Sequence, residues 1–223
     1  MKEIIITYIL QYLIIFILCG IYTLLGYKNL THFINTYCVI LLLIYYLIIT
    51  IYLYQKNKIK ESSFKPNIKN MYFLISTGIS IAIILNMIIF KTTNNTNTRT
   101  ISLPLAILSS GIIGPIYEEL LFRYIFLNRL KMYYSTKKSI LINTTLFAII
   151  HQNPIQMLYA FFLGLIINLF YDKYKNIIAP TIVHISANII VLFISGFNIY
   201  ILLLSLLLFI ITIKVSHKHL SLA

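Results

Sequence analysis

The amino-acid sequence predicts an all-α polytopic bundle of about eight transmembrane helices, and three observations support this fold class. Hydrophobic residues make up 60% of the 223 residues, whereas charged residues make up only 10%. A soluble domain carries roughly 25% charged residues, and a disordered chain is poor in apolar residues, so both classes are excluded. The third observation is that basic residues gather in short gaps between long apolar runs, which is typical of membrane proteins.

Eight apolar segments follow one another along the chain. A spanning helix needs about 20 residues, and the first four and the seventh segment reach that length, whereas the fifth and eighth are short. Asn153-Pro154 and Asn176 are predicted starts of helices, and Ser195-Gly196 is a predicted end. The segments are Ile4–Leu25, Phe33–Tyr54, Met71–Phe90, Ile101–Leu127, Ser139–Gln152, Ile155–Tyr171, Ile177–Ser195 and Ile199–Ile213.

We interpret the chain as one integral membrane domain, residues 1–223. Residues 1–100 hold three accessory helices without a signature, residues 101–195 hold the core helices that carry the buried polar residues, and residues 199–213 form the last helix. No internal repeat is visible. The two cysteines, Cys19 and Cys38, support neither a disulfide framework nor a thiolate metal site.

The distribution of basic residues predicts the orientation. With eight spans, 14 lysines and arginines fall on the side that holds both termini, and three fall on the other side. Lysine and arginine are enriched in cytoplasmic loops, so we expect both termini in the cytoplasm. The same distribution argues against nucleic-acid binding, although the net charge is +13. The three on the other side are Lys28, Lys91 and Arg99.

Only five acidic residues occur in the chain, and two of them, Glu118 and Glu119, are adjacent within an apolar segment. An ionisable residue inside the bilayer is costly and is therefore a functional hypothesis. Glu119 and Arg123 are four residues apart, so they share one helix face and can pair. This pairing leaves Glu118 free for chemistry. The alternative is an ion network of all three residues that only fixes helix packing.

Two further segments bring polar side chains into the apolar region. His151 closes the fifth segment, and His184 and Asn188 share one face of the seventh. Counted inward along the helices, Glu118, His151, His184 and Asn188 all fall in one middle layer of the bilayer. A single buried histidine would more often be an interhelical hydrogen-bond partner, but three segments that converge favour a site.

These residues form a compact hydrolytic set. Glu118 is a candidate general base, assisted by His151, and His184 and Asn188 are candidate donors to an oxyanion. One carboxylate and two imidazoles are also a catalytic zinc ligand set, so Glu118, His151 and His184 are the candidate ligands if a metal is used. The residues alone leave these two mechanisms open, and both hydrolyse an amide bond inside the membrane.

The spacing Glu118-Glu119-x-x-x-Arg123, Phe147-x-x-x-His151 and His184-x-x-x-Asn188 resembles the three motifs of the CPBP (CAAX protease and bacteriocin-processing, or Abi) family of intramembrane proteases. The resemblance runs from about Pro115 to Ile190 and includes Gly164. One departure is Tyr124, where the family usually has glycine. The resemblance implies a glutamate-activated water, with catalytic roles for Glu118, His151, His184 and Asn188 and supporting roles for Glu119 and Arg123. It also favours a metal-free mechanism, so we expect no cofactor, with zinc as the alternative.

The resemblance further implies a membrane-associated peptide or protein as substrate: a peptide pheromone, a bacteriocin precursor or a CAAX-like protein. The composition, rich in Ile, Asn, Lys and Tyr, suggests a bacterium and hence a multi-pass protein of the plasma membrane. Two other functions are compatible with buried ionisable residues. A proton-coupled transporter predicts internal repeats, which are not visible. A non-catalytic bacteriocin self-immunity or scaffold protein predicts the loss of a motif residue, and all are present.

Overall fold

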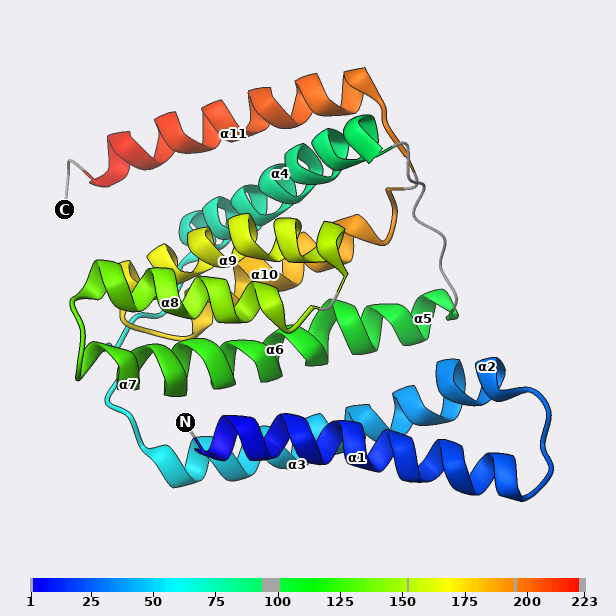
Figure 1. Ribbon diagram of the computed structural model, residues 1–223. Coiled ribbons are helices and arrows are strands. Elements are labelled where there is room, and N and C mark those ends of the chain that lie inside the picture. Colours follow the sequence, from blue (N-terminus) through cyan, green and yellow to red (C-terminus); the bar gives the residue numbers. More distant parts are fainter. Residues whose placement is uncertain (1, 94–100, 152, 195, 221–223) are drawn as a thin grey trace.

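A computed structural model describes residues 2–93, 101–151, 153–194 and 196–220. The described chain forms eight continuous helical segments (Figure 1), which is the number that the sequence predicts. Two of them are composite, because π-helical turns (η1 to η3) interrupt the α-helix without breaking it. The elements are α1 (Lys2–Leu24), α2 (Leu30–Phe33) with η1 (Ile34–Cys38) and α3 (Val39–Asn57), α4 (Ile68–Thr93), α5 (Leu103–Ala106) with η2 (Ile107–Ile113), α6 (Gly114–Glu119), η3 (Leu120–Leu127) and α7 (Asn128–Lys131), α8 (Thr136–Ile149), α9 (Pro154–Tyr174), α10 (Ile178–Val191) and α11 (Ile199–Leu220).

Four helices of the described chain are long and apolar enough to cross a membrane: Leu30–Asn57, Ile68–Ile89, Leu103–Lys131 and Pro154–Tyr174. Shorter apolar helices cover Ile9–Leu24, Ile178–Val191 and Ile199–Thr212. Large apolar side chains on several of these helices are exposed, as expected for surfaces that face lipid rather than water. The all-α, multi-pass membrane character that the composition predicts is therefore present in the structure.

Several helix boundaries differ from those predicted. The eighth segment, predicted to be short and to end at Ile213, is α11 and runs to Leu220. The seventh segment was expected to run to Ser195-Gly196, but α10 ends at Val191, because the amides of residues 192–194 bond to carbonyls three residues back and tighten the chain. Ser195 itself lies outside the described residues. The fifth segment begins and ends three residues earlier than expected, as α8 over Thr136–Ile149, and the predicted end Gln152 also lies outside them. The predicted cap at Asn153 is correct: its side chain accepts hydrogen bonds from two amides of α9.

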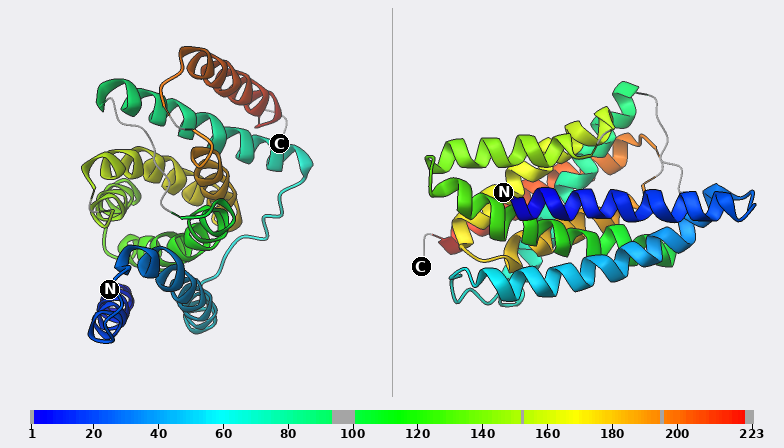
Figure 2. Two further views of the ribbon diagram at one scale, coloured as in Figure 1. Left: turned by 90° about the vertical axis from the view of Figure 1, so that its right-hand side faces the viewer. Right: turned by 60° about the horizontal axis from the view of Figure 1, so that its bottom comes forward.

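The helices between residues 103 and 191 form the centre of the bundle. Figures 1 and 2 show the hairpin of α1 and α3 along one edge and α11 outside α4 along the other. One apolar cluster joins the composite helix of residues 103–131 to α8 and α9, and a second joins α4, α9 and α10. α4 approaches α10 closely at Gly78, where a Cβ atom would collide with the Val183 carbonyl and the Ser186 hydroxyl.

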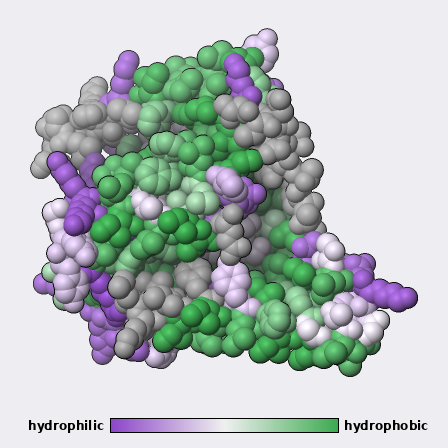
Figure 3. Space-filling view, in the orientation of Figure 1, coloured by the Kyte–Doolittle hydropathy of each residue, from purple (hydrophilic) through white to green (hydrophobic). Residues whose placement is uncertain are grey.

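The basic residues gather at one end of the bundle. Loop 58–67 and the turn after α9 meet there, because Glu61 Oε1 accepts a hydrogen bond of 2.7 Å from the Ile177 amide. Lys131 pairs with Asp172 at the same end, with 2.6 Å between Nζ and Oδ1. Figure 1 shows that α1 begins and α11 ends at this end too, as an even number of antiparallel spans requires. In Figure 3, hydrophilic residues lie along this end, at the opposite lower tip and near the centre of the face, and hydrophobic residues cover most of the rest.

Candidate active site

The buried ion pair predicted from the sequence is present. Arg123 Nη1 lies 3.0 Å from Glu119 Oε1, and both side chains are completely buried. Arg123 also donates a hydrogen bond of 3.2 Å from Nη2 to the Gly164 carbonyl of α9. Glycine is needed at position 164, since a Cβ atom there would lie 2.8 Å from the Phe147 ring and 3.4 Å from Arg123 Nη2.

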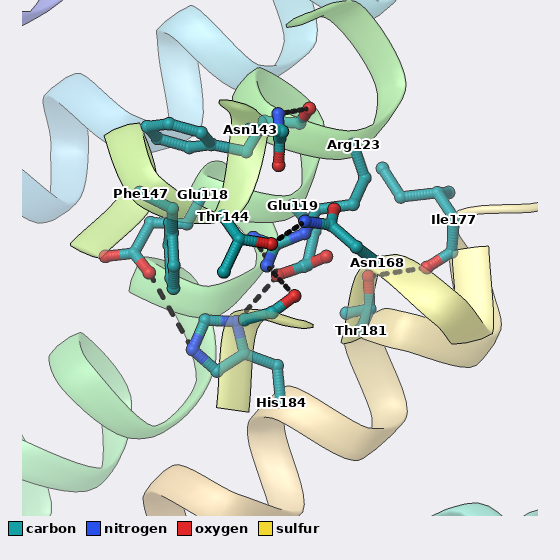
Figure 4. Close-up of polar contacts among 12 residues, drawn as sticks. Glu118, Glu119, Arg123, Asn143, Thr144, Phe147, Asn168, Ile177, Thr181 and His184 are labelled. Carbon is teal, nitrogen blue, oxygen red and sulfur yellow. Dashed lines mark hydrogen bonds and ion pairs between the residues drawn. The ribbon is translucent and has the colours of Figure 1, made fainter. Parts of the chain in front are cut away.

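The two adjacent carboxylates have different surroundings (Figure 4). Glu119 is completely buried, whereas 26% of the Glu118 side chain is exposed, and Glu118 lines a cavity. A buried carboxylate is tolerated only when charged or polar partners surround it, and Glu119 has them in Arg123 and His184. The structure therefore separates the two glutamates as expected: Glu119 faces the interior of the helix bundle, and Glu118 faces the cavity.

His184 of α10 lies between the two carboxylates. Its Nδ1 is 2.8 Å from Glu119 Oε1, and its Nε2 is 3.7 Å from Glu118 Oε2. A carboxylate accepts hydrogen bonds, so Nδ1 carries the proton toward Glu119 and Nε2 is directed toward Glu118 and the cavity. The contact between His184 and Glu119 was not predicted. It joins two helices, and no spacing within the sequence reveals it.

Phe147 of α8 is the second feature that sequence reasoning missed, although it stands in the second motif. The Arg123 guanidinium carbon lies 4.4 Å from the centroid of its ring. The rings of His151 and His184 contact Phe147 edgewise, with centroids 5.0 Å and 6.0 Å away. Phe147 is 1% exposed. A single rigid ring thus fixes the cation of the ion pair and both histidines relative to one another.

His151 does not close a helix, as the sequence suggested, but lies in the turn after α8. Its Nδ1 is 2.8 Å from the Phe147 carbonyl oxygen. Because a carbonyl only accepts, Nδ1 must carry a proton, and in the neutral ring Nε2 is the basic nitrogen. The turn therefore presents a histidine in the tautomer that can accept a proton.

Asn188 of α10 is held across the cavity by the composite helix. Its Nδ2 donates a hydrogen bond of 2.9 Å to the Ser110 carbonyl. A carboxamide nitrogen has two hydrogens, so this bond orients the amide and uses one of them. Ser110 belongs to η2, a π-helical turn that ends with the Gly114 amide bonded to the Ser109 carbonyl five residues back. Such turns accompany functional sites in many helices, and this one directly precedes Pro115 and the two glutamates.

All four candidate catalytic residues line one cavity of about 480 Å³. Glu118 comes from α6, His151 from the turn after α8, and His184 and Asn188 from α10. Pro115 and Gly114 lie on its wall, beside Glu118. The convergence of these residues, inferred from helix depth alone, is confirmed as a spatial arrangement.

A second layer of polar residues lies behind the ion pair. Asn143 of α8 donates from Nδ2 to the Phe122 carbonyl at 2.8 Å, and Asn168 of α9 donates to Thr144 Oγ1 at 2.8 Å. All three side chains are fully buried. Asparagines inside apolar segments were a signal for this layer, but only the packing of α8 on α9 shows what they bond. The layer lies between the helices that present Phe147 and Gly164.

Tyr124, which stands where glycine is usual in the resembling family, has a structural role. Its hydroxyl accepts a hydrogen bond of 2.7 Å from the Ile59 amide, and its ring stacks on Tyr54 with centroids 5.3 Å apart. Tyr124 therefore ties the end of α3 and the following loop to the composite helix. It contacts Tyr54 and Ile59, whereas Arg123 next to it pairs with Glu119.

A metal site is not evident in the donor geometry. Within the residues that the structure describes, no group of three or more His, Cys, Asp or Glu side chains could hold a metal ion. His184 Nδ1 and His151 Nδ1 are both engaged by oxygen atoms of the protein. Whether the protein uses zinc stays a prediction to be tested.

Comparison with known proteins gives one family. Residues 100–190 match the model of Rce1-like proteins, described as type II CAAX prenyl endopeptidase Rce1-like. Searches of curated proteins and of solved structures found no match. The matched segment contains all six residues of the candidate site, from Glu118 to Asn188, and agrees with the CPBP resemblance of the motifs. Residues 100–190 of this membrane protein thus form an Rce1-like domain of the CPBP family, a family of proteases.

Proposed function

We propose that this protein is an intramembrane endopeptidase that hydrolyses a peptide bond of a membrane-associated peptide or protein with a glutamate-activated water. The observation that supports this most directly is the shared cavity, in which Glu118, His151, His184 and Asn188 face one space while Glu119 and Arg123 are sealed behind it. Family membership of residues 100–190 supports the reaction class. Pheromone precursors, bacteriocin precursors and CAAX-like proteins are the substrate classes that we consider.

In the proposed reaction, Glu118 takes a proton from water while the oxygen of that water attacks the carbonyl carbon of the substrate. His151 assists through Nε2, because its Nδ1 proton is bonded to Phe147. His184 Nε2 and the second hydrogen of Asn188 Nδ2 donate to the oxyanion of the tetrahedral intermediate. His184 must hold both ring protons to make this donation, because its Nδ1 already faces Glu119. Glu118 then passes its proton to the leaving nitrogen as the C–N bond breaks, and a carboxylic acid and an amine result.

Glu119 and Arg123 act in this proposal as positioning residues. Glu119 holds the Nδ1 side of His184, so the opposite nitrogen faces the cavity. Arg123 neutralises Glu119 and braces Phe147. This division leaves one charged carboxylate available to water, and no step of the reaction requires a metal ion. Zinc held by Glu118, His151 and His184 is the alternative.

We further propose that the chain crosses the membrane eight times, with both termini and the basic end of the bundle in the cytoplasm. At the basic end, loop 58–67 bonds to the turn after α9 and Lys131 of α7 pairs with Asp172 of α9. These contacts bring the basic segments to one side of the bundle, and the excess of lysine and arginine there supports this orientation. α10, with 14 residues, is short for a spanning helix and would cross within the protein rather than against lipid, since its middle is buried against α4. The plasma membrane of a bacterium is the proposed location.

Comparative peptidomics of cells is the experiment that tests the function. Cells that produce the wild-type protein are compared with cells that produce Glu118→Gln, in which the carboxylate cannot accept a proton. Glu61→Gln is the matched control, because it makes the same chemical change at the far end of the bundle. We expect cleavage products that disappear with Glu118→Gln and persist with Glu61→Gln. Products that persist with Glu118→Gln would contradict the proposed mechanism.

A further inference from the structure

The cavity that holds Glu118 extends in one direction only. On α10 its wall begins at His184 and continues to Leu192, and on α9 it runs from Ile155 to Leu163. Leu163 and His184 mark its deep end, where they are 1% and 3% exposed. Ser110, Asn153 and Gln156 mark the opposite end, where their side chains are exposed. Eight residues of α10 correspond to about 12 Å, which is the length of a few residues of extended chain.

The cavity opens at the end of the bundle that lies opposite the basic loops. The basic end of the bundle contains loop 58–67 and the turns that follow α7 and α9. The rim of the cavity lies at the other end of the bundle, at the turn between α8 and α9 and near the end of α10 (Figure 1). Glu118 and His184 close the cavity toward the basic end, so a polypeptide must approach them from the non-basic end.

The wall of the cavity combines apolar side chains, such as Ile89, Ile155 and Leu192, with polar ones, and it bears little charge. Among the described residues that line it, Glu118 is the single acidic residue, and none is lysine or arginine. Its other polar groups are carboxamides and hydroxyls, contributed by Asn86, Ser110, Asn153, Gln156, Tyr159 and Asn188. Neutral donors and acceptors match the amides of an extended peptide, whereas a charged side chain would lose its hydration without gaining a counter-charge.

We infer that this cavity binds an extended, uncharged stretch of polypeptide that enters from the end of the bundle opposite the basic loops. The inference rests on the proposed function for the identity of the occupant. On the proposed orientation, the substrate reaches the catalytic groups from the extracytoplasmic side. Gln156, exposed at the rim and three residues before Tyr159 on the same face of α9, is the specificity-determining position that selects against charge.

The direction of entry is tested by labelling in proteoliposomes, without any need for activity. Cys19 and Cys38 are replaced by serine, and a single cysteine is introduced as Gln156→Cys, Lys91→Cys or Lys137→Cys. Lys91 is exposed at the non-basic end and Lys137 at the basic end. We expect a membrane-impermeant maleimide to label Gln156→Cys from the same side as Lys91→Cys. Labelling from the side of Lys137→Cys, or none while Lys91→Cys is labelled, would overturn the inference.

The preference for an uncharged segment is tested by placing a charged residue in the peptide and an opposite charge at position 156 of the protein. A pool of blocked, neutral hexapeptides with one photoreactive residue is cross-linked to the Glu118→Gln protein, which cannot turn them over. Placing one Asp or Lys in the peptides should weaken cross-linking about tenfold. Gln156→Glu should restore cross-linking of the Lys peptides alone, and Gln156→Lys should restore cross-linking of the Asp peptides alone. The control Lys137→Glu should restore cross-linking of neither. Equal cross-linking of charged and neutral pools, or cross-links that map outside α9 and α10, would overturn the inference.

The same peptides separate the two proposals. Peptides that cross-link as expected but are not cleaved by the protein with Glu118 intact would refute the proposed endopeptidase and leave the binding inference standing. Peptides that are cleaved but whose charge has no effect would refute the binding inference and leave the endopeptidase standing.

Discussion

Replacement of Arg123 by methionine tests the buried ion pair directly. Methionine keeps an apolar stem but leaves the Glu119 carboxylate in the interior without the cation that lies 3.0 Å away. Loss of one partner of a buried pair costs about 3–5 kcal/mol. Two further contacts are lost with the guanidinium, namely the hydrogen bond to the Gly164 carbonyl and the contact with the Phe147 ring. His184 still donates to Glu119 and limits the cost, so we expect a destabilisation within that range.

The expected change is large enough for a thermal melt. For a chain of this length, a loss of 1 kcal/mol lowers the melting temperature by roughly 2–4 °C, so Arg123→Met should melt about 6–20 °C below the wild type. Helical circular dichroism in detergent is a suitable signal, because the described chain is helical throughout its long elements. Lys137→Met is the matched control: it also exchanges a cation for methionine, but at an exposed position, and should melt like the wild type.

A second variant identifies the cause of the destabilisation. In Glu119→Gln/Arg123→Met both charges are absent, and a buried pair replaced by neutral groups of similar volume often costs little. We therefore expect the double variant to recover most of the stability that Arg123→Met loses. Wild-type melting of Arg123→Met would refute the buried-pair reasoning, and a double variant no more stable than Arg123→Met would show that an unpaired charge is not the cause.

Two other predictions concern metal and pH. Peptidase activity of the purified protein should survive exhaustive chelation, and activity that is lost and then restored by zinc would overturn the metal-free mechanism. Burial raises the pKa of Glu61, and the hydrogen bond from the Ile177 amide only partly opposes this. Since the folded pKa lies above the unfolded one, the contribution of Glu61 to stability is complete below its unfolded value and is lost as pH rises through the folded value. The melting temperature of the wild type relative to Glu61→Gln should therefore increase as pH falls from 7 toward 4.5, and a constant difference would contradict the assignment.

Local spacing predicted the parts of the site that lie within one helix. Glu119 and Arg123 are four residues apart, and a helix of either α or π type keeps them on neighbouring turns, so their ion pair followed from the sequence. The Asn153 cap was predictable for the same reason, since the amides that it binds are two and three residues away. A count of residues along each segment placed Glu118, His151 and His184 in one middle layer, and the structure brings all three to one cavity.

Contacts between helices were not predictable from one sequence. The bond from His184 to Glu119 joins residues 65 positions apart, and the rotation of α10 about its axis decides which carboxylate it reaches. The same holds for Phe147, whose ring contacts Arg123 of η3, His151 of the turn after α8 and His184 of α10. The π-helical turns escaped prediction because their extra residue per turn leaves the apolar pattern unchanged.

The separation of the two glutamates has a consequence for the comparison of related sequences. Glu119 and Arg123 are enclosed with His184 in the interior, so their loss threatens the folded protein whether or not it is an enzyme. Glu118 has an exposed edge, and a lineage that no longer needed hydrolysis would be free to replace it. On the proposed mechanism, a relative that keeps Glu119 and Arg123 but lacks Glu118 should fold without hydrolysing peptides. The second glutamate of the pair would then report on the fold, and the first on the proposed reaction.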